Sequence, residues 1–382
     1  MSPAKRDIIV RSDLHLQVRS DSSVVADFAR LLRSKKACKL IINGDLFDLD
    51  QVAGERKAGE GAYRAINRVR AILNRFEDLS ACLYEWIDRG GQIVWLPGNH
   101  DAELCLPEVQ KLIVKRMNLD PARVRFETDA YREDDIHIEH GHQRDPDNRF
   151  IPDTKTAVAK ERLSAFPLGC LTTRFLLCRI PAYTNQGDNH HTPNKVLMRV
   201  IRDYGWATPR MVGLYILAAL RIAFQAIRAR RQRDVEHQST MFSPFRVLSR
   251  MYLDRVVVTA LLAGFIIIGL TGILASSDLP SLTSKFALAA GLPCIAILLW
   301  PPTRKQRYRH RDRLGCRLAS RDLRRKGAKI VIMGHTHYAE QHSGPHGTYL
   351  NPGAFFQASP SGRPYVTISG QVARVDRLAA DR

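Results

Sequence analysis

The sequence lacks any C-x-x-C pair, and its seven cysteines are scattered between Cys38 and Cys316. This spacing excludes a disulfide-rich secreted scaffold and favours a reducing compartment. We find no internal repeat and no low-complexity tract. Lys5, Arg6 and Asp7 lead directly into a strand-like run, so we expect no secretory leader at this end.

Acidic residues are few relative to basic ones: 38 Asp and Glu stand against 58 Lys and Arg, a formal net charge of +20. Such an excess predicts an anionic partner, which is nucleic acid, a phosphate-bearing substrate or the acidic face of a membrane. Hydrophobic residues at 45% and charged residues at 25% are typical of a globular protein. A chain of 382 residues has room for a catalytic domain and an accessory region.

Short apolar runs alternate with stretches of helical periodicity in the first third of the chain, which is the pattern of an α/β domain. This pattern stops near residue 150 and resumes near residue 321. We therefore predict a first domain segment over 1–150, a helical insert over 151–320 and a second domain segment over 321–382. The expected strands are Ile8–Val10, Leu40–Ile42, Ile93–Leu96, Val124–Phe126, Ile136–Glu139, Lys329–Met333, Tyr349–Asn351, Pro364–Ile368 and Val372–Val375, and the expected helical stretches are Val24–Leu32 and Ala62–Ile87.

Polar residues of the types that bind metals follow five of these strands, at the point where each strand ends. Ligand groups collect in loops at the carboxyl ends of strands in such sheets, so we expect the five loops to meet. Each motif alone is weak evidence, but five in this order, each after a strand, are a specific signal. The motifs are Asp13-x-His15, Gly44-Asp45-x-x-Asp48, Gly98-Asn99-His100-Asp101, His140-Gly141-His142 and Gly334-His335-Thr336-His337.

The residue types in these motifs suit the hydrolysis of a phosphate ester. That reaction needs a nucleophile made from water and positive charge beside the phosphate oxygens, and a pair of divalent ions supplies both. Carboxylates, imidazoles and an amide oxygen suit Mn first, with Fe, Zn or Mg as alternatives, and the lack of thiolate ligands argues against a structural zinc site. One carboxylate must bridge the two ions, and Asp45 is our candidate because it lies on the central loop of the first three.

The five motifs resemble those of the calcineurin-like metallophosphoesterase superfamily, over about residues 7–142 and 328–353. The resemblance implies an α/β fold in the form of a four-layer α/β/β/α sandwich, here with an inserted helical, membrane-associated region. It also implies the ligands of two metal ions. One ion would be held by Asp13, His15, Asp45 and His337, and the other by Asp45, Asn99, His140 and His335.

The same resemblance implies two catalytic residues. His100 would contact the substrate phosphate or the leaving group, and Asp101 would orient His100, as a carboxylate beside an imidazole commonly does. Asp48 is expected to have a supporting role, because its spacing does not force it onto a metal. Asn351-Pro352-Gly353 resembles the turn that follows the last histidine motif in this superfamily and is expected to be architectural.

Five further residues near the motifs have a plain structural interpretation. We expect His142 to support a neighbouring ligand, with direct metal binding as the alternative. His190 and His191 are interpreted as ordinary loop residues of the insert, although they are also placed to approach a substrate phosphate. Cys170 and Cys178 lie in an apolar stretch, and we expect both to be buried packing residues rather than ligands.

The insert contains two long apolar runs. Val256–Ala275 carries no charge over twenty residues, which is enough for a helix to cross a bilayer core of about 30 Å. A second run, residues 286–302, is shorter, and arginine-rich segments flank the pair. We predict a transmembrane hairpin over 256–275 and 286–302 with both ends, and therefore the catalytic domain, on the cytoplasmic side. The alternative is a very apolar helix pair buried in a soluble domain.

Met211–Ile227 is apolar but contains Arg221, and further arginines follow it. A basic amphipathic helix in the headgroup plane fits this stretch better than a third span. The excess positive charge thus lies beside the proposed membrane segments, where it would contact anionic lipid. This location argues against nucleic acid as the partner, and the sequence does not assign an oligomeric state.

Within the superfamily, the His-Gly-x motif followed by a helical insert is similar to the UDP-2,3-diacylglucosamine pyrophosphatases, which cut a pyrophosphate in a lipid precursor. Two departures put the substrate in doubt, since those enzymes typically carry Arg where this chain has His100, and their inserts are shorter. We predict a membrane-anchored hydrolase of a phosphate ester or pyrophosphate on a small molecule or a lipid, with an apolar cap over Leu163–Ile180. The rivals are a phosphodiesterase or phosphatase for soluble nucleotides, a nuclease, and a metal-free scaffold of this fold.

Overall fold

The computed structural model describes residues 7–50, 61–145, 147–150, 153–159, 166–179, 201–231, 327–357, 359 and 361–379. The chain divides into two compact units. The first comprises residues 1–190, 228–241 and 311–382, and the second comprises residues 191–227 and 242–310. Residues 153–159 and 166–179, which the sequence assigned to the insert, therefore belong to the first unit.

Six strands form the first sheet of the first unit: β1 (Asp7–Arg11), β2 (Lys39–Asn43), β3 (Gln92–Leu96), β4 (Val124–Phe126), β10 (Arg363–Ser369) and β11 (Val372–Leu378). Their order is β11-β10-β1-β2-β3-β4. The four strands from β1 to β4 are parallel, and β10 and β11 are antiparallel to their neighbours. Strands β1, β2 and β3 are almost wholly buried, which is why they read in the sequence as unbroken apolar runs.

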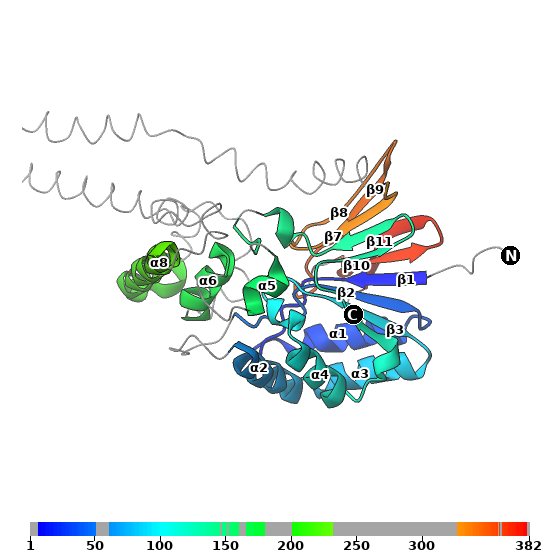
Figure 1. Ribbon diagram of the computed structural model, residues 1–382, viewed down its shortest axis with the longest axis horizontal. Helices are drawn as coiled ribbons and strands as arrows, with labels where there is room; N and C mark the ends of the chain where they lie inside the picture. Colours follow the sequence, from blue (N-terminus) through cyan, green and yellow to red (C-terminus); the bar gives the residue numbers. More distant parts are fainter. Residues whose placement is uncertain are drawn as a thin grey trace, which may run out of the picture. The chain divides into compact units, whose positions relative to one another are not determined.

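Four helices lie along one face of this sheet: α1 (Ser22–Arg33), α2 (Gly61–Arg75), α3 (Glu77–Asp88) and α4 (Pro107–Arg116) (Figure 1). The Asp21 side chain caps α1 by accepting a 2.9 Å hydrogen bond from the Ser23 backbone N–H. The helical stretch expected over Ala62–Ile87 is two helices, because the chain leaves the helical conformation at the buried Phe76 (φ −122°, ψ 66°). The sequence did not predict α4.

Five strands form the second sheet: β5 (Ala130–Glu133), β6 (Ile136–Glu139), β7 (Ile330–Met333), β8 (Ala339–Gly344) and β9 (Gly347–Pro352). Their order is β5-β6-β7-β9-β8, with β7 parallel to both β6 and β9. All the strands expected from the sequence are present, and β5 and β8 are additional. The long insert lies between β6 and β7 in the sequence. Because these two strands are neighbours in the sheet, the chain leaves the domain and returns to it at adjacent strands.

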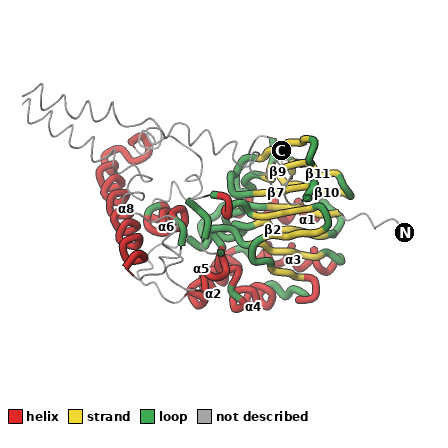
Figure 2. Tube along the Cα trace, turned by 45° about the horizontal axis from the view of Figure 1, so that its top comes forward, coloured by secondary structure: helices red, strands yellow, loops and turns green. Residues whose placement is uncertain are grey.

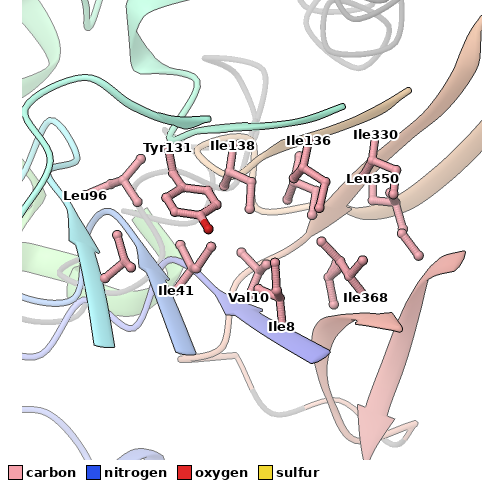
Figure 3. Close-up of a cluster of buried hydrophobic side chains, with 14 residues drawn as sticks. Ile8, Val10, Ile41, Leu96, Tyr131, Ile136, Ile138, Ile330, Leu350 and Ile368 are labelled. Carbon is pink, nitrogen blue, oxygen red and sulfur yellow. The ribbon is translucent and has the colours of Figure 1, made fainter. Parts of the chain in front are cut away.

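The main core lies between the two sheets (Figure 3), whose strands are yellow in Figure 2. Ile41 and Val10 of the first sheet lie opposite Ile138 and Ile330 of the second, and each fully buried side chain of this kind contributes about 1.5–3 kcal/mol. On its other face, the second sheet buries Val331, with Met333 and Tyr349. The described residues thus form a helix layer and two mixed sheets, as in a metallophosphoesterase sandwich. The fourth layer of the predicted sandwich is not among them.

In the second unit the structure describes residues 201–227, which form a helical segment with most of α8 (Thr208–Arg231). Within the described residues, Ile201–Gln225 is the one helix long and apolar enough to cross a membrane, a weak indication because buried helices of soluble proteins pass the same test. Whether it lies in the headgroup plane stays a prediction. The hairpin predicted over 256–275 and 286–302, and also His190 and His191, lie outside the described residues.

Candidate metal centre

The five motif loops come together at one edge of the two sheets. Asp13 and His15 follow β1, Asp45 follows β2, and Asn99 and His100 follow β3 in the first sheet. From the second sheet, β6 leads into His140, and β7 leads into His335 and His337. Every one of these strands is parallel to a neighbour in its own sheet, so their carboxyl ends meet, as the sequence predicted.

Backbone conformation in these loops is unusual. Seven described residues other than glycine have positive φ, and five of them are predicted metal ligands, with φ between 47° and 68°. Each such residue costs on the order of 1–3 kcal/mol and persists only where the surroundings enforce it. Backbone hydrogen bonds between loops do so here, from Asp13 N–H to Gly44 O (3.1 Å) and from His15 N–H to Asp45 O (2.8 Å).

The glycines of the motifs allow these loops to approach closely. A Cβ atom added to Gly44, which has a φ of 78°, would overlap Nδ1 of His140, and one added to Gly98 would overlap the Asp45 carboxylate. Side chains at these two positions would therefore push predicted ligands apart.

Asp13, His15 and His337 form the first cluster, in which one ligand-type atom from each residue lies within 4.8 Å of the others. Nε2 of His337 lies 3.3 Å from Oδ1 of Asp13 and 3.1 Å from Nε2 of His15. All three side chains are almost completely buried.

Asp45, His140 and His335 form the second cluster, within the same 4.8 Å limit. Oδ2 of Asp45 lies 3.2 Å from Nε2 of His140 and 3.6 Å from Nε2 of His15. Asp45 therefore lies between the two clusters. Nδ1 of His140 is 2.8 Å from the Asn43 carbonyl oxygen, to which it donates, so the Nε2 lone pair points towards the second cluster.

The buried atoms without a hydrogen-bond partner among the described residues include four from different predicted ligands. They are Oδ1 of Asp13, Oδ2 of Asp45, Oδ1 of Asn99 and Nε2 of His140. Buried polar atoms are almost always hydrogen-bonded, so four orphans on predicted ligands need an explanation. Carboxylate, amide and imidazole atoms that converge in this way fit divalent cations.

Charge at the site is arranged in opposing pairs. Burial disfavours the charged form of His140, but the Asp45 carboxylate outweighs burial and raises the pKa of His140 to about 9. Burial likewise opposes ionisation of Asp45, yet His140 and His100 hold the pKa of Asp45 below its usual range. Asp45 thus remains ionised although it is buried, and an ionised carboxylate is what a cation requires.

The sequence of the chain was compared with models of known protein families. The family model described as calcineurin-like phosphoesterase matches residues 7–206, more than half of the chain. The chain belongs to the calcineurin-like phosphoesterase family. Together with the His and Asp clusters, this membership makes it a metal-dependent phosphoesterase whose clusters could hold two divalent ions. The match ends before His335, and no curated protein matches the chain.

His100, the predicted catalytic residue of this family member, faces the centre. One of its ring nitrogens lies within 4.8 Å of ligand-type atoms of both His15 and Asp45. Its backbone N–H donates a 2.8 Å hydrogen bond to Oδ1 of Asp45. Nδ1 of the ring lies 3.0 Å from Oδ2 of Asp50. The ring is therefore held by Asp50 and not by Asp101.

Asp101 has a different role from the one predicted. Its carboxylate accepts hydrogen bonds from the backbone N–H groups of Asp45, Gly98, Leu46 and Phe47, at 3.1, 2.6, 2.9 and 3.3 Å. Burial and the nearby Asp45 charge raise the pKa of Asp101 to about 7. Asp101 thus fixes the backbone of the Asp45 loop. The prediction that it orients the His100 ring is wrong because its oxygens are already bonded to these amides.

The remaining predicted residues have supporting contacts. Asp48 lies 4.0 Å from His15 and 3.7 Å from His100, measured from carboxylate oxygen to ring nitrogen, and burial raises its pKa to about 6. Nε2 of His142 lies 3.2 Å from Oγ1 of Thr154, and its ring packs near His140.

Three other residues singled out in the sequence pack or hydrogen-bond within the fold. Asn351 donates through Nδ2 to the Gly334 carbonyl oxygen (2.9 Å) and so has the expected architectural contact. Cys170 and Cys178 are buried as expected. Cys170 additionally donates through Sγ to the Asn99 carbonyl oxygen (3.1 Å), which ties the first part of the insert to a predicted ligand loop.

Sequence reasoning missed four residues at the centre. Asp50 contacts His100, Asp145 lies 3.1 Å from Nε2 of His335, and Arg174 forms an ion pair with Asp50. The Phe356 ring stands edge-on to His15 and His337, with centroids 5.2 and 5.3 Å away. Asp50 follows Asp48 by two positions, which is a weak signal, whereas Arg174 and Phe356 have none because their contacts are made across the fold.

Proposed function

We propose that this chain is a hydrolase of phosphate esters with a two-ion centre. Its first ion would be held by Asp13, His15, Asp45 and His337, and its second by Asp45, Asn99, His140 and His335. The position of Asp45 Oδ2, 3.6 Å from His15 and 3.2 Å from His140, carries this proposal. An oxygen placed between two clusters is what a bridging carboxylate requires.

Two divalent ions bound there supply positive charge to the phosphate oxygens and lower the pKa of water enough to make it a nucleophile. The protein residues around them do the rest. Asp101 holds the Asp45 loop, and the His140 ring is fixed by the Asn43 carbonyl oxygen. His100 Nε2 would give its proton to the leaving oxygen as the bond between phosphorus and that oxygen breaks.

Substrate and metal are tested together. The purified protein is stripped with a chelator and assayed on phosphomonoesters, phosphodiesters and nucleotide-lipid pyrophosphates, with Mn, Fe, Zn or Mg added back. We expect hydrolysis of one ester class only after a divalent ion is restored. Full activity in the metal-free protein would contradict the two-ion centre, and binding of ions without hydrolysis of any ester would support a scaffold.

We further propose that the enzyme is held at the cytoplasmic face of a membrane and acts on a lipid-linked phosphate or pyrophosphate. Support comes from the apolar helix Ile201–Gln225 and its exposed side chains Trp206, Leu220 and Phe224. The resemblance to UDP-2,3-diacylglucosamine pyrophosphatases and the hairpin predicted at 256–275 and 286–302 point the same way. Soluble nucleotides are the alternative substrate.

The cap predicted over the centre provides the test. Phe175 and Leu177 are only half-buried, whereas Leu176 is buried and has a packing role. Replacing Phe175 and Leu177 with Ser should raise KM for an acylated phosphate, while a small chromogenic ester is cleaved at the parent rate. Leu176→Ser is the control for damaged packing and should affect both substrates. A parent enzyme without preference for acylated substrates would rule out the lipid proposal.

A further inference from the structure

A row of buried charges of alternating sign connects the predicted catalytic histidine to the insert. It begins at His100 and continues through Asp50, Arg174 and Glu103 to Arg68. Asp50 is 1% exposed and Glu103 4% exposed. Arg174 lies on α6 (Leu168–Phe175), a helix of the stretch that the sequence assigned to the insert.

Asp50 is the closest carboxylate to the His100 ring. Its Oδ2 lies 3.0 Å from Nδ1, whereas the nearest oxygen of Asp48 is 3.7 Å from the same atom. An ionised carboxylate can only accept, so the contact places a proton on Nδ1 of His100. Nε2 is thereby left as the ring nitrogen that can give a proton to the leaving oxygen. The contact fixes the orientation of the ring as well as its proton.

Arg174 holds Asp50 from the opposite side. Its Nε pairs with the other carboxylate oxygen, Oδ1 of Asp50, and its Nη2 donates to Oε1 of Glu103 at 2.8 Å. The guanidinium also stacks on the Phe166 ring, 4.0 Å from the centroid. A buried carboxylate needs such a partner to remain ionised, and Arg with two fixed hydrogen bonds is a rigid one.

A second contact ties α6 to the same place. One turn before Arg174, Cys170 donates through Sγ to the carbonyl oxygen of Asn99, the residue before His100. Helix α6 therefore contacts both the backbone beside His100 and the carboxylate that holds the His100 ring. Helix α6 is thus separated from the proposed catalytic histidine by one residue, Asp50.

We propose that Asp50 is the positioning residue of His100 and that Arg174 of α6 keeps Asp50 in place, so that the start of the insert is part of the active site. The inference rests on the proposed role of His100 in hydrolysis. Its consequence is specific: loss of Asp50 should impair proton transfer to the leaving group while substrate binding and the two ions are retained.

The experiment compares two esters of the same size and charge, p-nitrophenyl phosphate and phenyl phosphate, with the Mn-loaded full-length protein. Their methyl diesters are used if the parent cleaves only diesters. Phenolate without the nitro group is the poorer leaving group and depends more on protonation. For Asp50→Asn we expect kcat on the phenyl ester to fall about 10–100-fold, a much smaller loss on the p-nitrophenyl ester, and unchanged KM and Mn content.

Glu103→Gln is the matched control, because it removes an equally buried carboxylate from Arg174 without touching His100. The ratio of the two rates should stay at the parent value in this variant. Arg174→Lys keeps the charge but cannot make both hydrogen bonds, and it should shift the ratio in the same direction as Asp50→Asn. Equal losses on both esters in Arg174→Lys would mean that Arg174 only anchors the helix, and the insert would have no part in the chemistry.

A readout without turnover completes the test. The parent should show a downfield, slowly exchanging ring N–H proton by NMR that disappears in both His100→Gln and Asp50→Asn, while Glu103→Gln retains it. An unchanged rate ratio in Asp50→Asn, with this resonance retained, would overturn the inference although the enzyme remains a metal-dependent hydrolase. Failure of the proposed function gives a different result, because the parent protein itself would then cleave neither ester with any ion.

Discussion

Nε2 of His140 lies 3.2 Å from Oδ2 of Asp45, and neither atom has a hydrogen-bond partner among the described residues. Two buried ligand-type atoms from different sheets are thus aimed at one another across a short gap. A divalent ion beside them would give both atoms a partner, because a carboxylate oxygen and an imidazole nitrogen are both metal ligands.

Asp45→Asn should therefore lose both metal and activity. The amide keeps the shape of the side chain but removes the negative charge that the two clusters share. We expect elemental analysis to find less than the two ions per chain of the reconstituted parent, and hydrolysis to fall to background. Asn43→Ala, which removes a nearby side chain without a ligand role, is the comparison. A fully loaded Asp45→Asn protein would show that Asp45 is not a bridging ligand.

His100 and Asp101 are neighbours in the sequence but should respond differently to substitution. His100→Ala should lower kcat by about 10²–10⁴-fold and leave the metal content near that of the parent. Asp101→Asn should instead destabilise the fold by about 1–3 kcal/mol, because the new amide group faces backbone N–H donors that then lack an acceptor.

Chemical denaturation with elemental analysis separates these two effects. Metal loss in His100→Ala would make His100 a ligand. An Asp101→Asn variant with parental stability but a large fall in kcat would restore the catalytic role that its contacts with Asp45 and Gly98 now argue against.

The sequence predicted the ligand loops well because they combine two strong signals. Each is a short polar motif, and each comes directly after an apolar run that is buried on both faces, as in Ile8–Val10. β8 was missed because its sequence, Ala339–Gly344, has no apolar alternation and lies at an edge of its sheet. The break at Phe76 was missed because neither glycine nor proline marks it.

The contacts around His100 could not be predicted for a different reason. Asp101 is adjacent in sequence and was the natural partner, but adjacency says nothing about side-chain direction after a sharp turn. Asp50 is 50 positions from His100, and Arg174 is 124 positions from Asp50. Pairings over such separations depend on the packing of α6 against the loops, which no local pattern encodes.

The predicted topology of the insert is open to a labelling experiment. A cysteine at Ser277, in the short loop between the two apolar runs, should react with an impermeant thiol reagent from outside intact cells. Cys316, after the second run, should react only when the membrane is opened, because the positive-inside rule places it in the cytoplasm. Reaction of Cys316 alone in intact cells would reverse the orientation, and release of the protein without detergent would favour a soluble helix pair.

Gly44→Ala tests whether the close approach of the loops maintains the metal centre. Gly44 has a φ of 78°, and an added Cβ would overlap the His140 ring and approach the Gly98 backbone within 2.9 Å. Gly90 has a similar φ of 91°, but nothing described lies within 4 Å of its added Cβ. Gly90→Ala therefore shares the backbone cost of about 1–2 kcal/mol and lacks the collision.

We expect both variants to lose stability, and only Gly44→Ala to lose metal affinity, by about 10–100-fold as the His140 ring is displaced. Titration of Mn into the metal-free proteins, followed calorimetrically, measures this difference directly. Equal Mn affinity in the two variants would mean that the loop relaxes around the methyl group. The ring of His140 would then owe its position to the Asn43 carbonyl oxygen, and Asn43, with the rest of β2, would be the next place to probe.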